Sequence, residues 1–416
     1  MELTRSSGWR QLRRQLATGA KPFALRTALD AIAHDLVALG VEPRLVEAVG
    51  RGLEVGAWDD AVHAFSSAVD APAGFYLGPM RAAEGEPLAT GLLLLRRTRG
   101  AADLVTRIES LASPLGARLF GFPLRDHGRH VELYDALCAD GPFAAGRGKY
   151  IALFTPFYLG GWRDGARQTN ARRTILFHDV VRRRFDVRTR CFASRLVLDG
   201  GVPAYGTAPD EALDAAITLW LTLHELVHGS GPLPLFGAPV GKIPLGAAYG
   251  GVEEFRVDAT VWLLLDTCAD LVGASATLAR DIVLGERLTR AARGSLDAGP
   301  SLRNDFDAEH GALWLALLHR GGAARLDAAG RLSVDCAAAA AILREVLAEL
   351  YAVEDEVATG DPEIGAARLC AYADALRARA FGRADWPHLA PAAATWLRRL
   401  PSPAPVEIGV APEKAG

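Results

Sequence analysis

Apolar residues recur at helical spacing along most of the chain, and only a few segments have the pattern of a strand. Recurrence at positions i, i+3, i+4 and i+7 is typical of a helix with one buried face. It predicts helices over Ala28–Leu39, Ala101–Leu111, Leu213–His228, Glu253–Leu271, Ala308–His319 and Ala337–Val357. Strand-like patterns are fewer and cover Tyr150–Phe157, Thr174–Phe177 and Phe192–Leu198. The pattern predicts a mainly α protein of the α+β class, with a small α/β portion before residue 200.

This pattern also predicts the division of the chain. Residues 1–200 are expected to form a reduced α/β lobe, and residues 201–400 a helical lobe. The tail 401–416 is rich in proline and is expected to be disordered. Clusters of glycine and proline predict loops at Phe75–Glu86 and Gly229–Gly251.

Composition narrows the class of protein. The chain has 416 residues, of which 50% are hydrophobic and 23% are charged, as in an ordinary globular protein. A net charge of −3 gives no general case for nucleic-acid or membrane binding, and apolar runs such as Val261–Leu265 are too short to span a bilayer. The five cysteines form no CxxC pair, and the N-terminus lacks the apolar core of a signal peptide. We expect a cytoplasmic protein, and the sequence does not determine its oligomeric state.

The most informative segment is His-Glu-Leu-Val-His, residues 224–228, at the end of a predicted helix. Two histidines four residues apart lie on one face of a helix, where both imidazoles can bind Zn²⁺. Glu225 between them is placed to act as a general base towards a water molecule beside the metal. Gly229 follows as a candidate C-cap. The alternative is that these are ordinary residues on a solvated face, but the flanking residues are apolar, which favours a buried site that needs a partner.

A second acidic segment, Glu253-Glu254-Phe255-Arg256-Val257-Asp258, opens the next long apolar helix. Glu254 follows His228 by 254 − 228 = 26 residues, a plausible spacing for a third metal ligand. Spacing alone leaves open whether Glu253 or Glu254 is that ligand. With Glu254 as the ligand, Glu253 and Asp258 would accept the second N–H of the two imidazoles. Arg256 would neutralise the neighbouring carboxylates.

These residues, in this order, resemble the zinc core of the dipeptidyl peptidase III family. The family has a His-Glu-x-x-Gly-His motif followed by Gly-Ser-Gly, and the form here, HELVHGSG, is one residue shorter. EEFRVD matches the family's Glu-Glu-Cys-Arg-Ala-Glu/Asp motif, whose second glutamate is the ligand, which implies Glu254. The resemblance covers roughly residues 70–380. It implies a zincin-like helical catalytic lobe and an N-terminal lobe that contributes one wall of a cleft.

The same resemblance implies two further catalytic residues. His310, in Phe-Asp-Ala-Glu-His-Gly, falls where the family has a histidine that stabilises the transition state. Tyr76, in Phe-Tyr-Leu-Gly-Pro, falls where the family has an active-site tyrosine, which implies binding of the substrate carbonyl or its oxyanion.

Other positions depart from the family pattern. The family's glutamate two residues before the tyrosine, which grips the free amino group of a peptide, is Gly74 here. Two asparagines expected before Arg167-Gln168-Thr169 are absent, and Leu159 and Trp162 occupy the nearest positions. The chain is also shorter than typical members. We therefore expect the metal chemistry to be retained and dipeptidyl-peptidase specificity to be lost.

The predicted function is a zinc-dependent hydrolase that directs metal-activated water at the peptide or amide-like bond of a small substrate, either a peptide or an amide-bearing metabolite. An arginine-rich stretch between residues 163 and 190 has two interpretations. It is either a solvated face or an anion site, and the second would make the substrate acidic. Two other functions stay open: a zinc isomerase or lyase acting on a small metabolite, and a non-catalytic binding protein with a peptidase fold.

Overall fold

The structure is a computed structural model that describes residues 6–81, 87–120, 130–142, 152–153, 158–160, 173–234, 240–297, 306–326 and 331–382. The described residues group into two compact units. The first, here called the sheet unit, lies within Met1–Ala102 and His130–Arg183, and the second, the helical unit, within Asp103–Arg129 and Arg184–Pro403. The predicted lobe boundary at residue 200 stays a prediction, and the tail 401–416 lies outside the described residues.

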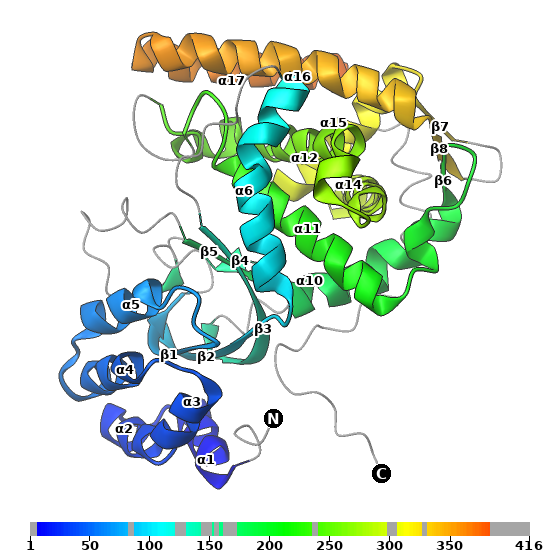
Figure 1. Ribbon diagram of the computed structural model, residues 1–416. Coiled ribbons are helices and arrows are strands. Elements are labelled where there is room, and N and C mark those ends of the chain that lie inside the picture. Colours follow the sequence, from blue (N-terminus) through cyan, green and yellow to red (C-terminus); the bar gives the residue numbers. More distant parts are fainter. Residues whose placement is uncertain are drawn as a thin grey trace. The chain divides into compact units, whose positions relative to one another are not determined.

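The sheet unit begins with five short helices and continues into a five-stranded sheet (Figure 1). Its helices are α1 (Ser7–Ala17), α2 (Pro22–Asp30), α3 (Ala33–Leu39), α4 (Pro43–Val55), α5 (Trp58–Ser67) and α10 (His178–Arg184). Its strands are β1 (Ala73–Met80), β2 (Ala89–Arg97), β3 (His130–Asp140), β4 (Ala152–Leu153) and β5 (Arg173–Phe177). The strand order is β1-β2-β3-β5-β4, with β3 and β5 parallel and the other pairs antiparallel.

Three strands of the sheet unit, β1, β2 and β3, were not predicted from the pattern, and the core explains this for β1 and β2. The run Leu92–Leu95 of β2 is fully buried, because α4 and α5 pack beside the sheet and apolar residues fill both of its faces. Gly78 and Pro79 predicted a loop, and this prediction is wrong, since both belong to β1. As β1 is an edge strand, proline is tolerated there without breaking the ladder.

The helical unit contains most of the remaining chain. Its helices are α6 (Ala101–Phe120), α11 (Asp210–His228), α12 (Gly250–Thr267), α13 (Ala269–Val272), α14 (Ala276–Asp297), α15 (Phe306–Arg320), α16 (Cys336–Thr359) and α17 (Pro362–Phe381). Shorter helical segments are η2 (Phe185–Arg190), η3 (Ala193–Arg195), η4 (Ala204–Gly206) and η5 (Ile243–Ala248). A small sheet has the order β6 (Leu196–Leu198), β8 (Leu332–Val334), β7 (Ala324–Leu326).

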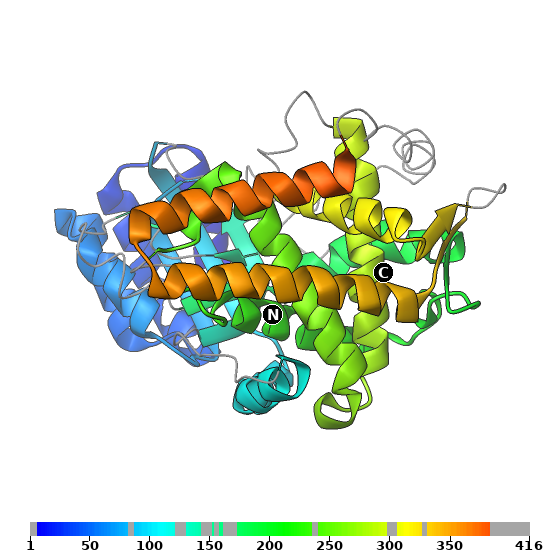
Figure 2. The same ribbon diagram turned by 90° about the horizontal axis from the view of Figure 1, so that it is seen from above.

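Helix α12 is the centre of the helical unit. It packs against α11, α14, α15 and α16, and the long helices α16 and α17 run side by side over this bundle (Figures 1 and 2). From Phe255 to Leu265 all its residues are buried, as expected of a helix that contacts neighbours on every side. The edge-to-face contact of Trp262 with Trp314 of α15, at 6.1 Å between ring centroids, is part of this packing.

The mainly α fold class is confirmed, with a small share of sheet. The helices predicted at 213–228, 253–271, 308–319 and 337–357 correspond to α11, α12, α15 and α16. The predicted helix Ala28–Leu39 is wrong as a single element, because the chain turns between α2 and α3. The strand Phe192–Leu198 is reduced to β6. Among the described residues, no helix has the length and hydrophobicity that a membrane span requires.

The close contact between α14 and α15 requires a glycine, Gly311, at the point where the two helices meet. A Cβ atom at Gly311 of α15 would lie 2.6 Å from the Arg287 carbonyl oxygen and 2.7 Å from the Ala291 nitrogen, both backbone atoms of α14.

We expect Gly311→Ala to lower the free energy of unfolding by about 1–3 kcal/mol, because the two helices must separate. Denaturant unfolding measures this. Gly201→Ala, whose Cβ would meet one atom at 3.8 Å, is the control, and equal effects of the two substitutions would contradict the packing argument.

Candidate metal centre

The last turns of α11 and the first turns of α12 supply the predicted site. Helix α11 starts with Asp210 and Glu211, which suit the positive end of the helix dipole, and it ends at its C-cap, Gly229. His228 is buried and His224 is half-buried, four residues apart on the same helix face. The apolar remainder of α11 packs into the bundle and thereby fixes the direction of this face.

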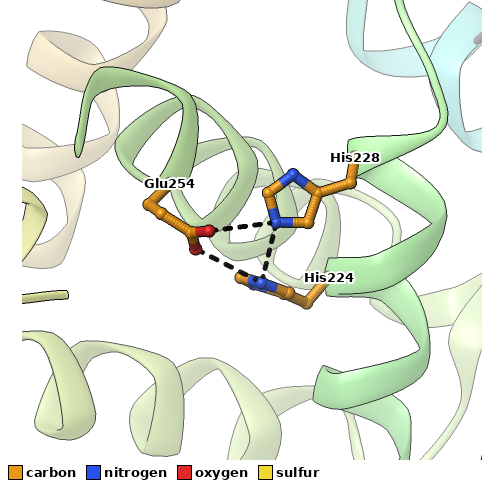
Figure 3. A group of neighbouring side chains, drawn as sticks. All are labelled: His224, His228 and Glu254. Carbon is orange, nitrogen blue, oxygen red and sulfur yellow. Dashed lines mark hydrogen bonds and ion pairs between the residues drawn. The ribbon is translucent and has the colours of Figure 1, made fainter. Parts of the chain in front are cut away.

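Three side chains converge with metal-binding atoms facing one another, namely His224, His228 and Glu254 (Figure 3). The two Nε2 atoms are 3.1 Å apart. Glu254 Oε2 lies 3.5 Å from His224 Nε2, and Glu254 Oε1 lies 3.4 Å from His228 Nε2. Ligand atoms of a tetrahedral zinc ion with bonds of about 2.1 Å are about 3.4 Å apart. The donor types and their spacing therefore fit three ligands of such an ion.

The other ring nitrogen of each histidine contacts a buried carboxylate. His224 Nδ1 is 2.9 Å from Asp258 Oδ1, and His228 Nδ1 is 3.0 Å from Glu253 Oε1. An imidazole that donates its Nδ1–H to a carboxylate has its lone pair on Nε2, where a metal can bind it. Thus Glu253 faces the back of one imidazole, whereas Glu254 faces the Nε2 atoms of both.

Each carboxylate is held in turn by cationic or polar groups. Arg256 donates from Nη2 to Glu253 Oε1 at 2.7 Å and from Nε to Glu253 Oε2 at 2.8 Å. Asp258 accepts from Trp220 Nε1 at 3.1 Å, and its Oδ2 lies 2.9 Å from Arg287 Nε. Burial opposes ionisation of both carboxylates, but Arg256 and Arg287 outweigh it and hold both pKa values well below the ordinary range.

The same carboxylates act on the charge of His228. Its burial disfavours the charged ring, but Glu254 and Glu253 outweigh this effect and raise the pKa of His228 to about 9. Burial also opposes ionisation of Glu254, while His228 and His224 lower its pKa far below the usual range. A proton and a metal ion therefore compete for the same nitrogen.

Two further candidate side chains belong to the helical unit, Glu225 and His310. Glu225 is buried on α11, beside His224 in the sequence. His310, on α15, is completely buried, with Nε2 3.2 Å from Asp258 Oδ2. Burial and the adjacent Arg287 lower the pKa of His310 to about 3, so its ring is neutral. Asp258 thus contacts both a metal-ligand candidate and His310.

Tyr76 belongs to the sheet unit and has a different environment. Its side chain is fully buried on β1, packs edge-to-face on Phe65, and donates its hydroxyl hydrogen to the Pro79 carbonyl at 3.1 Å. Burial raises its pKa well above the ordinary value. These contacts explain Tyr76 as a core residue, and its catalytic role stays a prediction. A Cβ at Gly74 would contact Phe65 and Leu95 at 3.5–3.6 Å, an apolar environment with no contact typical of an ammonium site.

The other sequence-based candidates divide between the described and undescribed residues. Arg163, Arg167 and Arg172, the Arg167–Thr169 string and Trp162 lie outside the described residues. Within the described part of the arginine stretch, Arg183 pairs with Asp179, and Arg190 with Asp186. These pairs within the chain give no support to an acidic substrate.

Some residues that contact the site lie far from its two motifs in the sequence, and the sequence pattern did not predict them. They include Lys242, Arg287, Tyr351 and Glu354, which all have buried side chains. Lys242 is one of only four lysines in the chain, a weak signal, and it lies in a segment predicted as loop. Arg287 lies on α14, a helix that the apolar pattern did not predict.

Comparison with known proteins gives a fold and no sequence family. No family model matches the chain, and no curated protein matches it. Two of the solved structures that share its fold are dipeptidyl peptidases III. Dipeptidyl peptidase III from Caldithrix abyssi has a TM-score of 0.60 at 15% identity, over 86% of this chain and 67% of that one. Dipeptidyl-peptidase III from Corallococcus sp. strain EGB has a TM-score of 0.58 at 15% identity, over 95% and 68%. The chain therefore has a dipeptidyl peptidase III-like fold.

Zn²⁺ and a proton compete for the imidazole of His228. Since the pKa of His228 is raised to about 9, the ring is protonated below that pH, and Zn²⁺ must displace the proton. We expect the apparent zinc affinity of chelator-treated protein to rise with pH between 6 and 8, by up to about tenfold per unit for one proton. Titration calorimetry in buffers of different ionisation enthalpy measures the protons released. An affinity independent of pH in this range would show that His228 is not protonated.

The substitution Tyr76→Phe distinguishes a core role of this side chain from a catalytic one. If Tyr76 is a core residue, Tyr76→Phe removes one hydrogen bond and costs about 1 kcal/mol of stability. We expect turnover and KM to stay at their wild-type values in steady-state assays. A fall in kcat without loss of stability would instead support the catalytic role.

Proposed function

We propose that this protein is a zinc-dependent hydrolase that cleaves a peptide or amide bond of a small substrate. The observation that carries the proposal is the convergence of His224, His228 and Glu254, with each Nδ1 held by a buried carboxylate. The likeness in fold to two dipeptidyl peptidase III structures supports a peptidase-like hydrolase.

In this proposal His224, His228 and Glu254 hold the metal through two nitrogens and one oxygen. Three protein ligands are typical of a catalytic zinc site, whereas structural sites have four. Zinc bound there would polarise a substrate carbonyl and lower the pKa of water to about 7. Asp258 and Glu253 keep the two imidazoles oriented throughout.

Glu225 is the proposed general base. It takes a proton from water as the oxygen of that water attacks the carbonyl carbon, and it delivers the proton to the leaving nitrogen when the carbon–nitrogen bond breaks. The products are an amine and a carboxylic acid, which keeps the second proton of the water until it ionises to the carboxylate.

His310 is the proposed stabiliser of the oxyanion. Its neutral ring carries a single N–H, and in this proposal that hydrogen is donated to the developing negative charge in place of Asp258. The contacts of His310 with Asp258 and Arg287 hold its ring in place. We do not extend the proposal to removal of dipeptides, because Gly74 provides no carboxylate for a peptide's amino group.

Glu225→Gln tests the general base. The amide cannot accept the proton, so we expect zinc content to be unchanged and turnover to fall by about 10²–10⁴-fold. The assay uses tripeptides to octapeptides and dipeptide arylamides as probes, with metal content measured on the same samples. Glu211→Gln, an exposed carboxylate on the same helix, is the matched control.

The assay also tests the alternative functions. Hydrolysis in isotope-labelled water places the label in the product carboxylate, whereas an isomerisation would place none there. Full turnover by Glu225→Gln would exclude this residue as the base. Zinc-loaded wild-type protein that hydrolyses none of the probes would contradict a peptidase and favour one of the alternative functions.

A further inference from the structure

Four buried charged side chains meet behind His228, and we call them the buried quartet: Lys242, Glu253, Arg256 and Glu354. Lys242 Nζ lies 3.2 Å from Glu354 Oε1 and 3.4 Å from Glu253 Oε2. Arg256 Nη2 lies 2.7 Å from Glu253 Oε1, and Arg256 Nε lies 3.5 Å from Glu354 Oε1. The side chains of Lys242, Arg256 and Glu354 are 0% exposed.

The quartet is assembled from three separate segments of the chain. Lys242 comes from the segment before η5, Glu253 and Arg256 come from α12, and Glu354 comes from α16. Burying four charges costs several kcal/mol each before their attraction is counted, and apolar residues of similar size often serve stability as well. Stability alone therefore gives a weak reason for Lys242 and Glu354.

The position of Glu253 points to a different role. Its Oε1 accepts from Arg256 and also contacts His228 Nδ1, so any movement of this carboxylate turns a metal-ligand candidate. Arg256 and Lys242 each lie within 4 Å of both carboxylates of the quartet. With both cations present, each carboxylate has a cation, and the quartet has two positive and two negative charges.

Removing Lys242 alone would upset this balance. Two buried carboxylates would then compete for Arg256, whose Nε is already 3.5 Å from Glu354. A shift of Arg256 towards Glu354 would loosen Glu253 and, through it, the ring of His228. If Glu354 is neutral as well, that competition disappears and Arg256 can stay with Glu253.

We propose that Lys242 is a positioning residue for the metal centre: it neutralises the buried carboxylate of Glu354, so that Arg256 stays bound to Glu253 and orients His228. The inference rests on the proposed metal site, but it concerns residues that contact none of the three ligand candidates in the described structure. Tyr249, whose hydroxyl donates to Glu354 Oε1 at 3.0 Å, further fixes the far side of the quartet.

The test measures zinc affinity by competition with a chromophoric chelator, on chelator-treated full-length protein. Loss of a group that orients a metal-binding histidine typically weakens affinity by about 10–100-fold, and we expect this of Lys242→Met. We expect Glu354→Gln to bind zinc as wild type does. The double variant, Lys242→Met with Glu354→Gln, should regain most of the affinity lost by Lys242→Met.

Two surface substitutions are matched controls: Lys21→Met, an exposed lysine, and Glu349→Gln, a more exposed glutamate on the same helix as Glu354. Thermal unfolding of metal-free samples separates positioning from stability, because a merely structural pair would change the melting temperature and leave the zinc affinity of the folded protein unchanged. If Lys242→Met does not fold, Lys242→Gln takes its place under the same criteria.

The outcomes distinguish the inference from the proposed function. The inference would be overturned if Lys242→Met bound zinc with wild-type affinity, or if the double variant bound zinc no more tightly than Lys242→Met. Either result would leave the proposed metal centre intact. Wild-type protein that binds no zinc would overturn both. Weak binding by the Lys242 variant with recovery in the double variant would support both.

Discussion

The hydrogen bonds between α11 imidazoles and α12 carboxylates are the interactions on which the site depends. Asp258 and Glu253 contact the Nδ1 atoms of His224 and His228 at 2.9 and 3.0 Å. They point both Nε2 atoms at Glu254, on the same helix as the two carboxylates. One helix thus supplies a ligand candidate and the orientation of the other two, so the packing of α11 on α12 sets the geometry of the centre.

This arrangement needs buried charge in the middle of an apolar bundle. Uncompensated carboxylates at Glu253 and Asp258 would be strongly destabilising, because ionised groups lose the solvation that water provides. Arg256 and Arg287 compensate them, from α12 itself and from α14. The close approach of α14 and α15 at Gly311 places Arg287 and His310 beside the same carboxylate. Packing and chemistry are therefore coupled through Asp258.

The likeness to dipeptidyl peptidase III structures is in the fold, at 15% identity. Against this background the residues of the metal centre and those of peptide recognition differ. The centre has a complete set of ligand candidates with oriented imidazoles. In the sheet unit, Gly74 faces apolar neighbours, and the Tyr76 hydroxyl is engaged by a backbone carbonyl. The described residues therefore offer a candidate metal centre, whereas the contacts of Gly74 and Tyr76 are those of core residues.

The sequence by itself determined α11, α12 and α15 and the types of residue that form the metal centre, because both follow from local spacing, whereas α14 was not predicted. A spacing of four positions places two histidines on one face of a helix, and a continuous apolar run predicts α12 as a buried helix. It did not predict β1, since Gly78 and Pro79 have the composition of a turn and only the edge position of the strand makes them tolerable. The choice between Glu253 and Glu254 as the residue facing both Nε2 atoms was decided by tertiary structure, as were the burial of Tyr76 and the meeting of Lys242 with Glu354. These depend on which helix faces pack together, and contacts between residues about a hundred positions apart leave no periodic signal in the chain.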